Sequence, residues 1–155
     1  MRVLMVCLGN ICRSPLAEGI LKHKTKNKNI FVDSAGTASY HLGKLPDTRS
    51  IEIANKYGID ISNQRARQFS KIDFDSFDKI YAMDTHNFAS IISIARNQSD
   101  INKVDLILNE INPKSFDSIP DPYYGHGDGF EKVYNMLNEA CDIIANKLWK
   151  KESYF

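Results

Sequence analysis

The stretch "VCLGNICRSP" occupies Val6 to Pro15 and directly follows the apolar residues Val3-Leu4-Met5. The apolar run predicts a short buried strand from Arg2 to Val6 that ends at a loop containing glycine. Ser14-Pro15 then predicts the start of a helix, because serine caps helices and proline suits the first helical position. The chain therefore opens with a strand, a tight loop and a helix.

The rest of the chain continues this alternation of strands and helices. Further strands are predicted at 30–32, 80–83 and 104–108, and further helices from 46, over about 84–96 and from 128. The pattern predicts an α/β fold: a single domain over residues 1–155, with a four-stranded parallel sheet and helices on both faces. Ligands of such sheets bind beyond the carboxyl ends of the strands. We therefore expect Cys7 and Asp121 on the same rim.

Composition narrows the class of protein. Lys and Arg total 20 and Asp and Glu 19, and a net charge of +1 gives no argument for nucleic acid or an anionic membrane as partner. We expect the lysine cluster at 22–28 to be a solvated helix end. No apolar run reaches the ~18 residues of a membrane span, and no signal peptide is expected. Three cysteines favour a reducing compartment, so we expect a cytoplasmic protein. The sequence leaves the oligomeric state open, with a monomer as the default.

The loop after the first strand has the composition of an anion site. Its backbone N–H groups and the helix N-terminus favour a tetrahedral oxyanion, and the planar guanidinium of Arg13 can hold two oxygens at once. The same positive field favours the thiolate of Cys7, a nucleophile. Ser14 can donate to that sulfur, Gly9 permits close backbone approach, and Asn10 tolerates left-handed backbone angles.

Asp121 is the candidate proton donor. It lies between Pro120 and Pro122, which present it rigidly. Protonation of a leaving group typically contributes about 10²–10⁴-fold to the rate, and burial near a thiolate would help a carboxyl group to keep its proton. An aspartate that only caps a turn is the alternative. The Cys-x5-Arg spacing of Cys7 and Arg13 favours the catalytic interpretation.

These motifs together resemble the low-molecular-weight protein tyrosine phosphatases. Besides the loop at Cys7–Pro15, the shared segments are Ser34-Ala35-Gly36-Thr37, Pro46-Asp47, Ala66-Arg67-Gln68, Met83-Asp84 and Asp121-Pro122-Tyr123-Tyr124. The resemblance implies hydrolysis of phosphotyrosine in proteins, and of small aryl phosphates, through a phosphocysteine. Cys7 would be the nucleophile, Arg13 the phosphate clamp, and Asp121 the acid that later activates water.

The resemblance also implies the substrate site. It would consist of Leu8, Gly9, Asn10, Ile11, Cys12 and Ser14 in the loop and of Tyr40, Tyr123 and Tyr124. Asn10 and Ser14 would organise the loop, and the tyrosines would form a slot for a flat ring. Phosphate, vanadate and similar oxyanions are expected inhibitors. No cofactor is implied, and His23, His41, His86 and His126 lack the spacing of metal ligands.

Two residues raise separate questions. In this family a cysteine at the position of Cys12 can trap an oxidised nucleophile as a disulfide, which gives the hypothesis of reversible silencing by peroxide through Cys7–Cys12. Many relatives carry a histidine where Gln64 stands, and that histidine supports the asparagine of the loop. Gln64 can donate a hydrogen bond but carries no charge. We expect the loop to survive, and Cys141 to be a core residue.

Several alternatives share some of these features. An arsenate reductase of the same fold needs a redox cysteine pair past mid-chain, but no cysteine lies between Cys12 and Cys141. Protein-arginine phosphatases of the family tend to carry threonine where Ile11 stands. A nucleotide-binding enzyme would need a Gly-x4-Gly-Lys-Ser/Thr motif, which is absent. A non-catalytic phosphotyrosine-binding module remains the alternative of a different class, and turnover separates it from an enzyme.

Overall fold

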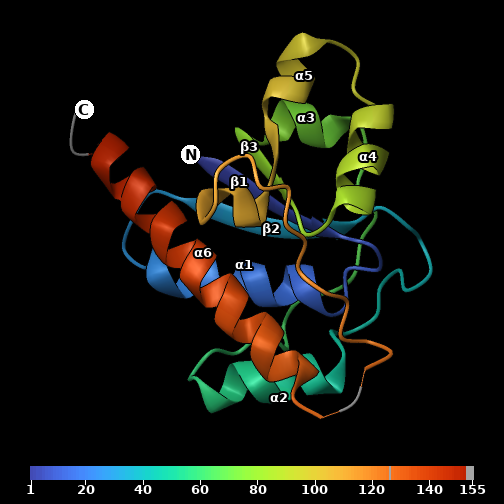
Figure 1. Cartoon of the computed structure of the whole chain (residues 1–155), viewed down its shortest axis with the longest axis vertical. Helices are drawn as coiled ribbons and strands as arrows, with labels where there is room; N and C mark the ends of the chain where they lie inside the picture. The colour runs from blue at the N-terminus through green and yellow to red at the C-terminus, as the bar shows by residue number, and fades with distance from the viewer. Residues whose placement is uncertain (126, 153–155) are drawn as a thin grey trace.

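A computed structural model describes residues 1–125 and 127–152, so His126 lies outside the described residues. The strands form one parallel sheet in the order β2-β1-β3-β4 (Figure 1). They are β1 (Arg2–Cys7), β2 (Phe31–Gly36), β3 (Lys79–Ala82) and β4 (Val104–Leu106). The helices are α1 (Arg13–Lys24), α2 (Thr48–Lys56), α3 (Ile72–Ser76), α4 (Thr85–Ser93), α5 (Gln98–Asn102), the 3-10 helix η1 (Ile107–Glu110) and α6 (Gly129–Glu152).

Helices cover both faces of the sheet, which confirms the predicted fold class (Figure 1). Side chains of β1 alternate between the two faces, because successive residues of a strand point in opposite directions. Val3 and Met5 pack in one core with α1, α2 and α6, whereas Leu4 and Val6 pack in a second core with α3 and α4. The central strand β1 is therefore buried on both sides, as its continuous apolar sequence predicts.

Some helix boundaries follow the sequence signals closely. The side chain of Asp47 caps α2 by accepting a hydrogen bond from the backbone N–H of Arg49. The chain leaves this helix at Gly58, whose φ of +77° is a left-handed angle that favours glycine. Cys141 is fully buried on α6, so its predicted place in the core is confirmed. No helix in the described part of the chain combines the length and apolar character needed to cross a membrane.

Other boundaries differ from the prediction. Helix α1 begins at Arg13, and Cys12, not Ser14, occupies the N-cap position. Ser14 does not cap because its hydroxyl group lies inside the loop, next to Cys7 and Asn10. Strand β2 extends to Gly36, four residues further than predicted, because it pairs with β1 as far as Cys7. Helices α3 and α5 were not predicted, since five residues are too few to show a helical period.

Candidate active site

The loop between β1 and α1 is held in a tight conformation. Asn10 has a φ of 56°, in the left-handed region. Its side-chain Nδ2 donates to Ser14 Oγ at 2.8 Å and to Ser34 Oγ at 3.0 Å, and its Oδ1 accepts from the backbone N–H of Arg67 at 3.0 Å. Gly36 lets β2 approach the loop, because a Cβ there would lie 2.7 Å from the carbonyl oxygen of Leu8. These contacts fix the loop at the carboxyl end of β1.

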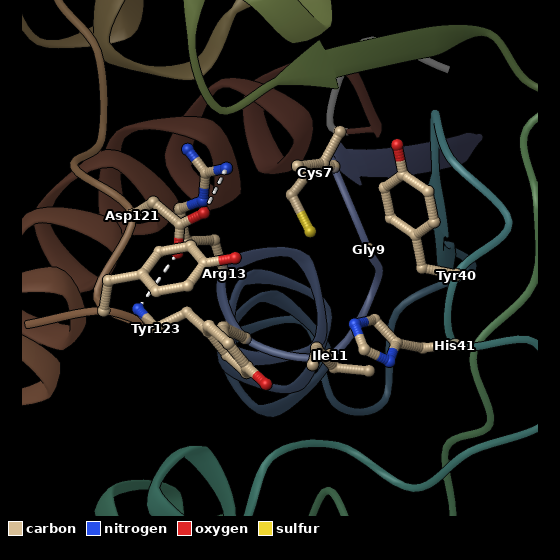
Figure 2. Close-up of a pocket in the computed structure, with 11 residues that line it drawn as sticks. Cys7, Gly9, Ile11, Arg13, Tyr40, His41, Asp121 and Tyr123 are labelled. Carbon is tan, nitrogen blue, oxygen red and sulfur yellow. Dashed lines mark hydrogen bonds and ion pairs between the residues drawn. The ribbon is translucent and has the colours of Figure 1, made fainter.

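The sulfur of Cys7 points into a pocket at this end of the sheet (Figure 2). Cys7 is the last residue of β1, and its Sγ lies 3.0 Å from Ser14 Oγ. The hydroxyl group can donate to a thiolate, as the sequence suggested. Around the sulfur, the pocket is lined by Leu8, Gly9, Ile11, Cys12, Arg13, Tyr40, His41, Asp121, Tyr123 and Tyr124.

Arg13 lies beside Cys7 and is fixed by two partners. Its Nη1 donates to Asp84 Oδ2 at 2.6 Å and to the carbonyl oxygen of Ile119 at 3.0 Å. Burial lowers the pKa of Arg13, but Cys7 and Asp84 outweigh it and the pKa is raised above its usual value. The guanidinium therefore keeps its charge and a fixed orientation, with one of its edges committed to the protein.

Asp121 reaches the same pocket from the loop that follows η1. Its Oδ2 lies 3.6 Å from Arg13 Nη2, and its Oδ1 accepts from the backbone N–H of Tyr123 at 3.0 Å. The aspartate thus both caps its own turn and faces Cys7 and Arg13. The burial expected for it is not found, since its side chain is 38% exposed. Asp121 lies at the open edge of the pocket because its loop follows the surface between η1 and α6.

The three tyrosines stand at the mouth of the pocket. Tyr40 comes from the loop after β2, and Tyr123 and Tyr124 lie beside Asp121; Figure 2 shows Tyr40 and Tyr123 on opposite sides of the opening. Tyr40 is 74% and Tyr124 84% exposed. The pocket therefore opens to the surface beside exposed aromatic rings.

Sequence reasoning missed two side chains of this site. Asp84 was recognised only as part of a shared segment, yet it caps α4 by accepting from the backbone N–H of Asn87 and also holds Arg13. His41 was considered only as a possible metal ligand, and that role was rejected, yet its ring lines the pocket beside Tyr40 and Tyr123. The signal for Asp84 was its position two residues after the end of β3. No signal in the sequence pointed to His41.

Two predicted residues lie beneath the pocket and do not line it. Asn10 and Ser14 are buried behind Cys7, where they hold the loop. Gln64 does not reach Asn10: its Nε2 donates to the carbonyl oxygen of Pro15 at 3.0 Å. Its Oε1 is buried and has no hydrogen-bond partner in the described part of the chain. Asn10 nevertheless has partners for both its amide nitrogen and its oxygen.

Cys12, the second cysteine of the loop, also lines the pocket. Burial, helped by the negative charge of Asp47, raises the pKa of Cys12 to about 12, so its thiol stays protonated at neutral pH. All three cysteines are buried thiols without a disulfide. Over residues 1–125 and 127–152, no three His, Cys, Asp or Glu side chains are grouped so that they could hold a metal ion.

Fold and pocket define an α/β protein with a cysteine and an arginine on the loop that joins β1 to α1, and comparison with known proteins identifies its family. Residues 2–154 match the family model described as low molecular weight phosphotyrosine protein phosphatase. The low molecular weight protein-tyrosine-phosphatase YfkJ of Bacillus subtilis is 37% identical, with 97% of each chain covered. The chain belongs to the low molecular weight phosphotyrosine protein phosphatase family, and it is an enzyme of this family.

Solved structures agree with this assignment. A protein tyrosine phosphatase from Entamoeba histolytica, with Hepes in its active site, superposes with a TM-score of 0.90 at 35% identity, covering 98% of this chain and 99% of its own. An arginine phosphatase from Drosophila superposes with a TM-score of 0.87 at 36% identity, covering 96% of this chain and 98% of its own. The same fold thus occurs both in a protein described as a tyrosine phosphatase and in one described as an arginine phosphatase.

Proposed function

We propose that this protein hydrolyses phosphotyrosine in proteins, with Cys7 as nucleophile, Arg13 as phosphate clamp and Asp121 as general acid and base. The observation that carries the proposal is the convergence of these three side chains on one pocket whose mouth carries three tyrosines. A flat ring between tyrosine rings gains stacking energy of about 0.5–1.5 kcal/mol per pair. The shorter phosphoserine could not bring its phosphoryl group to Cys7 while using those rings.

In the first step, the Cys7 thiolate attacks phosphorus and the P–O bond to the tyrosine breaks as the S–P bond forms. Asp121 gives its proton to the departing tyrosine oxygen. Arg13 Nη1 is already engaged by Asp84, so the remaining N–H groups of the guanidinium serve the phosphoryl oxygens. The backbone N–H groups of the loop share the charge that develops on those oxygens.

In the second step, water attacks the phosphocysteine and Asp121 takes its proton. The S–P bond then breaks, which releases inorganic phosphate and returns Cys7 to the thiolate. Ser14 stabilises the departing sulfur because its hydroxyl group lies 3.0 Å from Sγ. Phosphate and vanadate, which occupy the same loop, should compete with substrate. The three buried thiols are also in keeping with a cytoplasmic location.

Turnover of purified protein tests the proposal. We expect cleavage of para-nitrophenyl phosphate and of a phosphotyrosine peptide, much slower cleavage of the matched phosphoserine and phosphoarginine peptides, and competitive inhibition by vanadate. Cys7→Ser should reduce turnover to background and still bind inorganic phosphate, because the backbone N–H groups and Arg13 remain. Near-normal turnover by Cys7→Ser would rule out the covalent mechanism. Faster cleavage of phosphoarginine would reassign the substrate.

A further inference from the structure

Glu18 is a buried carboxylate that the proposed mechanism does not use. It lies on α1 and is 3% exposed. Its Oε1 accepts from Ser34 Oγ at 2.7 Å, and its Oε2 accepts from Lys22 Nζ at 2.7 Å. A buried charge is costly unless it is paired and hydrogen-bonded. Among the described residues Lys22 is the one cation within ion-pair distance of Glu18, and the lysine side chain is itself 53% exposed.

Hydrogen bonds connect this carboxylate to Cys7. Ser34 Oγ accepts from Asn10 Nδ2 at 3.0 Å, the same Nδ2 donates to Ser14 Oγ at 2.8 Å, and Ser14 Oγ lies 3.0 Å from Cys7 Sγ. A hydroxyl group has a single proton. Because Ser34 gives that proton to Glu18, the lone pairs of Ser34 remain available to Asn10. Protonation of Glu18 would weaken the charge-assisted hydrogen bond from Ser34, so the hydroxyl group of Ser34 would be held less firmly toward Asn10.

Among the described residues, the side chains that hydrogen-bond Asn10 are those of Ser14 and Ser34. Asn10 combines a left-handed backbone with side-chain hydrogen bonds that tie it to the surrounding chain. Gln64 donates to Pro15 and does not reach Asn10, so the two serines are the partners of Asn10 Nδ2. Ser34 is therefore one of the two hydrogen-bond acceptors of Asn10 Nδ2. Glu18 sets the direction of the Ser34 hydroxyl group, because it accepts the proton of that hydroxyl.

We propose that Glu18 and Lys22 are positioning residues for the phosphate-binding loop: the ionised carboxylate, held by Lys22, orients Ser34 so that Ser34 fixes Asn10. The proposal rests on the proposed function, because it concerns the same loop. Lys22, expected from the sequence to belong to a solvated helix end, thereby gains a role through its neighbour. Neither residue touches the substrate.

The surroundings of Glu18 determine how it responds to pH. Burial raises its pKa above the usual value, the negative charge of Asp33 on β2 raises it further, and Lys22 lowers it. Asp33 is itself paired with Arg67 at 3.0 Å. The other titratable groups around this surface hollow are His23, Lys26 and Asp60. Removal of the Lys22 charge must therefore raise the pKa of Glu18, and the ionised form would be lost at a higher pH.

The pH dependence of kcat/KM tests this inference, with para-nitrophenyl phosphate as substrate. In Lys22→Gln, we expect the acid limb of the profile to move upward by about half to one pH unit, because a cation within ~4–6 Å favours the carboxylate. Below that limb, kcat/KM should fall by roughly threefold to tenfold. Lys22→Arg should restore the original profile. Thermal unfolding of each variant checks that the fold is intact.

Two further variants make the test specific. Lys26→Gln removes an equal charge from the same hollow without touching the ion pair, and its profile should match the parent protein. In a Glu18→Gln background, Lys22→Gln should no longer move the acid limb, since no carboxylate remains to titrate. A parent-like profile for Lys22→Gln, or a shift that persists in the Glu18→Gln background, would overturn the inference. Absence of turnover in the parent protein would instead overturn the proposed function.

Discussion

Asp121 faces two demands at the residue scale. The same carboxylate accepts from the backbone of its own turn and lies 3.6 Å from Arg13, and the proposed mechanism also requires it to exchange a proton. In the open pocket it is partly exposed. A bound phosphoryl group would engage Arg13 and lie close to this carboxyl group.

Replacement of Asp121 should separate substrates by their leaving groups. We expect Asp121→Ala to slow hydrolysis of phosphotyrosine by about 10²–10⁴-fold, the usual contribution of general acid catalysis. The loss should be smaller for para-nitrophenyl phosphate, because para-nitrophenolate departs without protonation. Steady-state kinetics with the two substrates measures the difference. Equal losses for both would assign Asp121 to substrate binding or loop structure.

Cys12 presents a different residue-scale question. Its thiol stays protonated because burial raises its pKa to about 12, so it is a poor nucleophile at rest. Peroxide should first oxidise the sulfur of Cys7, which points into the pocket, to a sulfenic acid. Attack by Cys12 would then form an S–S bond and release water.

Intact-mass spectrometry tests this disulfide. After peroxide treatment we expect a loss of about two protons in mass and loss of activity, both reversed by a thiol reductant. The reaction should become faster with rising pH, since more Cys12 thiolate is then present. Cys12→Ser serves as the control and should accumulate oxygen adducts at Cys7. Irreversible adducts at Cys7 in the parent protein would contradict the hypothesis.

At the scale of elements, helix α1 shows how packing overrides local preference. Gly19 lies in its interior, where alanine is normally better by about 0.5–1 kcal/mol. A Cβ at this position would lie 2.4 Å from Ile61 Cγ2 and 3.1 Å from Ile59 Cγ2. The glycine therefore lets the chain after α2 approach α1, close to the residues that support the loop.

Alanine at Gly19 should destabilise the protein. We expect Gly19→Ala to lower the free energy of unfolding by about 1–3 kcal/mol, the usual cost of overpacking. That corresponds to a fall in Tm of roughly 2–12 °C for a chain of this size. Gly129→Ala is the matched control, because a Cβ there meets only Pro122 Cβ at 3.8 Å. Thermal unfolding that shows the two variants equally stable would contradict the packing argument.

The sequence predicts some helices and strands better than others. The long helix α6 and the strand β1 follow from periodicity and from a continuous apolar run. Helices α3 and α5 do not, because each is a single short turn whose stability comes from neighbours. Strand β4 ends at Leu106, two residues earlier than predicted, because the apolar residues Ile107 and Leu108 continue into the core as η1.

At the scale of the whole molecule, the pocket joins segments that are far apart in sequence. Cys7 is the last residue of β1, Tyr40 follows β2, and Asp121 follows η1. All three meet because the strands are parallel, so that their carboxyl ends share one edge of the sheet. The site therefore exists only in the folded chain, and an anion that binds it must stabilise the fold.

Inorganic phosphate should accordingly raise the melting temperature. At 100 times its Kd, phosphate should add about 2.7 kcal/mol, or roughly 5–11 °C in Tm. Cys7→Ser should keep the shift, since the N–H groups and the guanidinium remain, while Arg13→Ala should lose most of it. Differential scanning fluorimetry over a phosphate series, with sodium chloride as the ionic-strength control, measures the effect. An equal shift in Arg13→Ala would place the anion elsewhere.

The sequence by itself determined the chemistry of the loop and the alternating architecture. Both depend on local signals: the spacing of Cys7 and Arg13, the apolar strands, and the capping and glycine residues at helix ends. Only the tertiary structure decided which distant side chains complete the site. Asp84 lies 71 residues from the Arg13 that it holds, and Ser34 lies 16 residues from the Glu18 that orients it. Such partners are chosen by the order and register of the strands, and that information is spread over the whole chain.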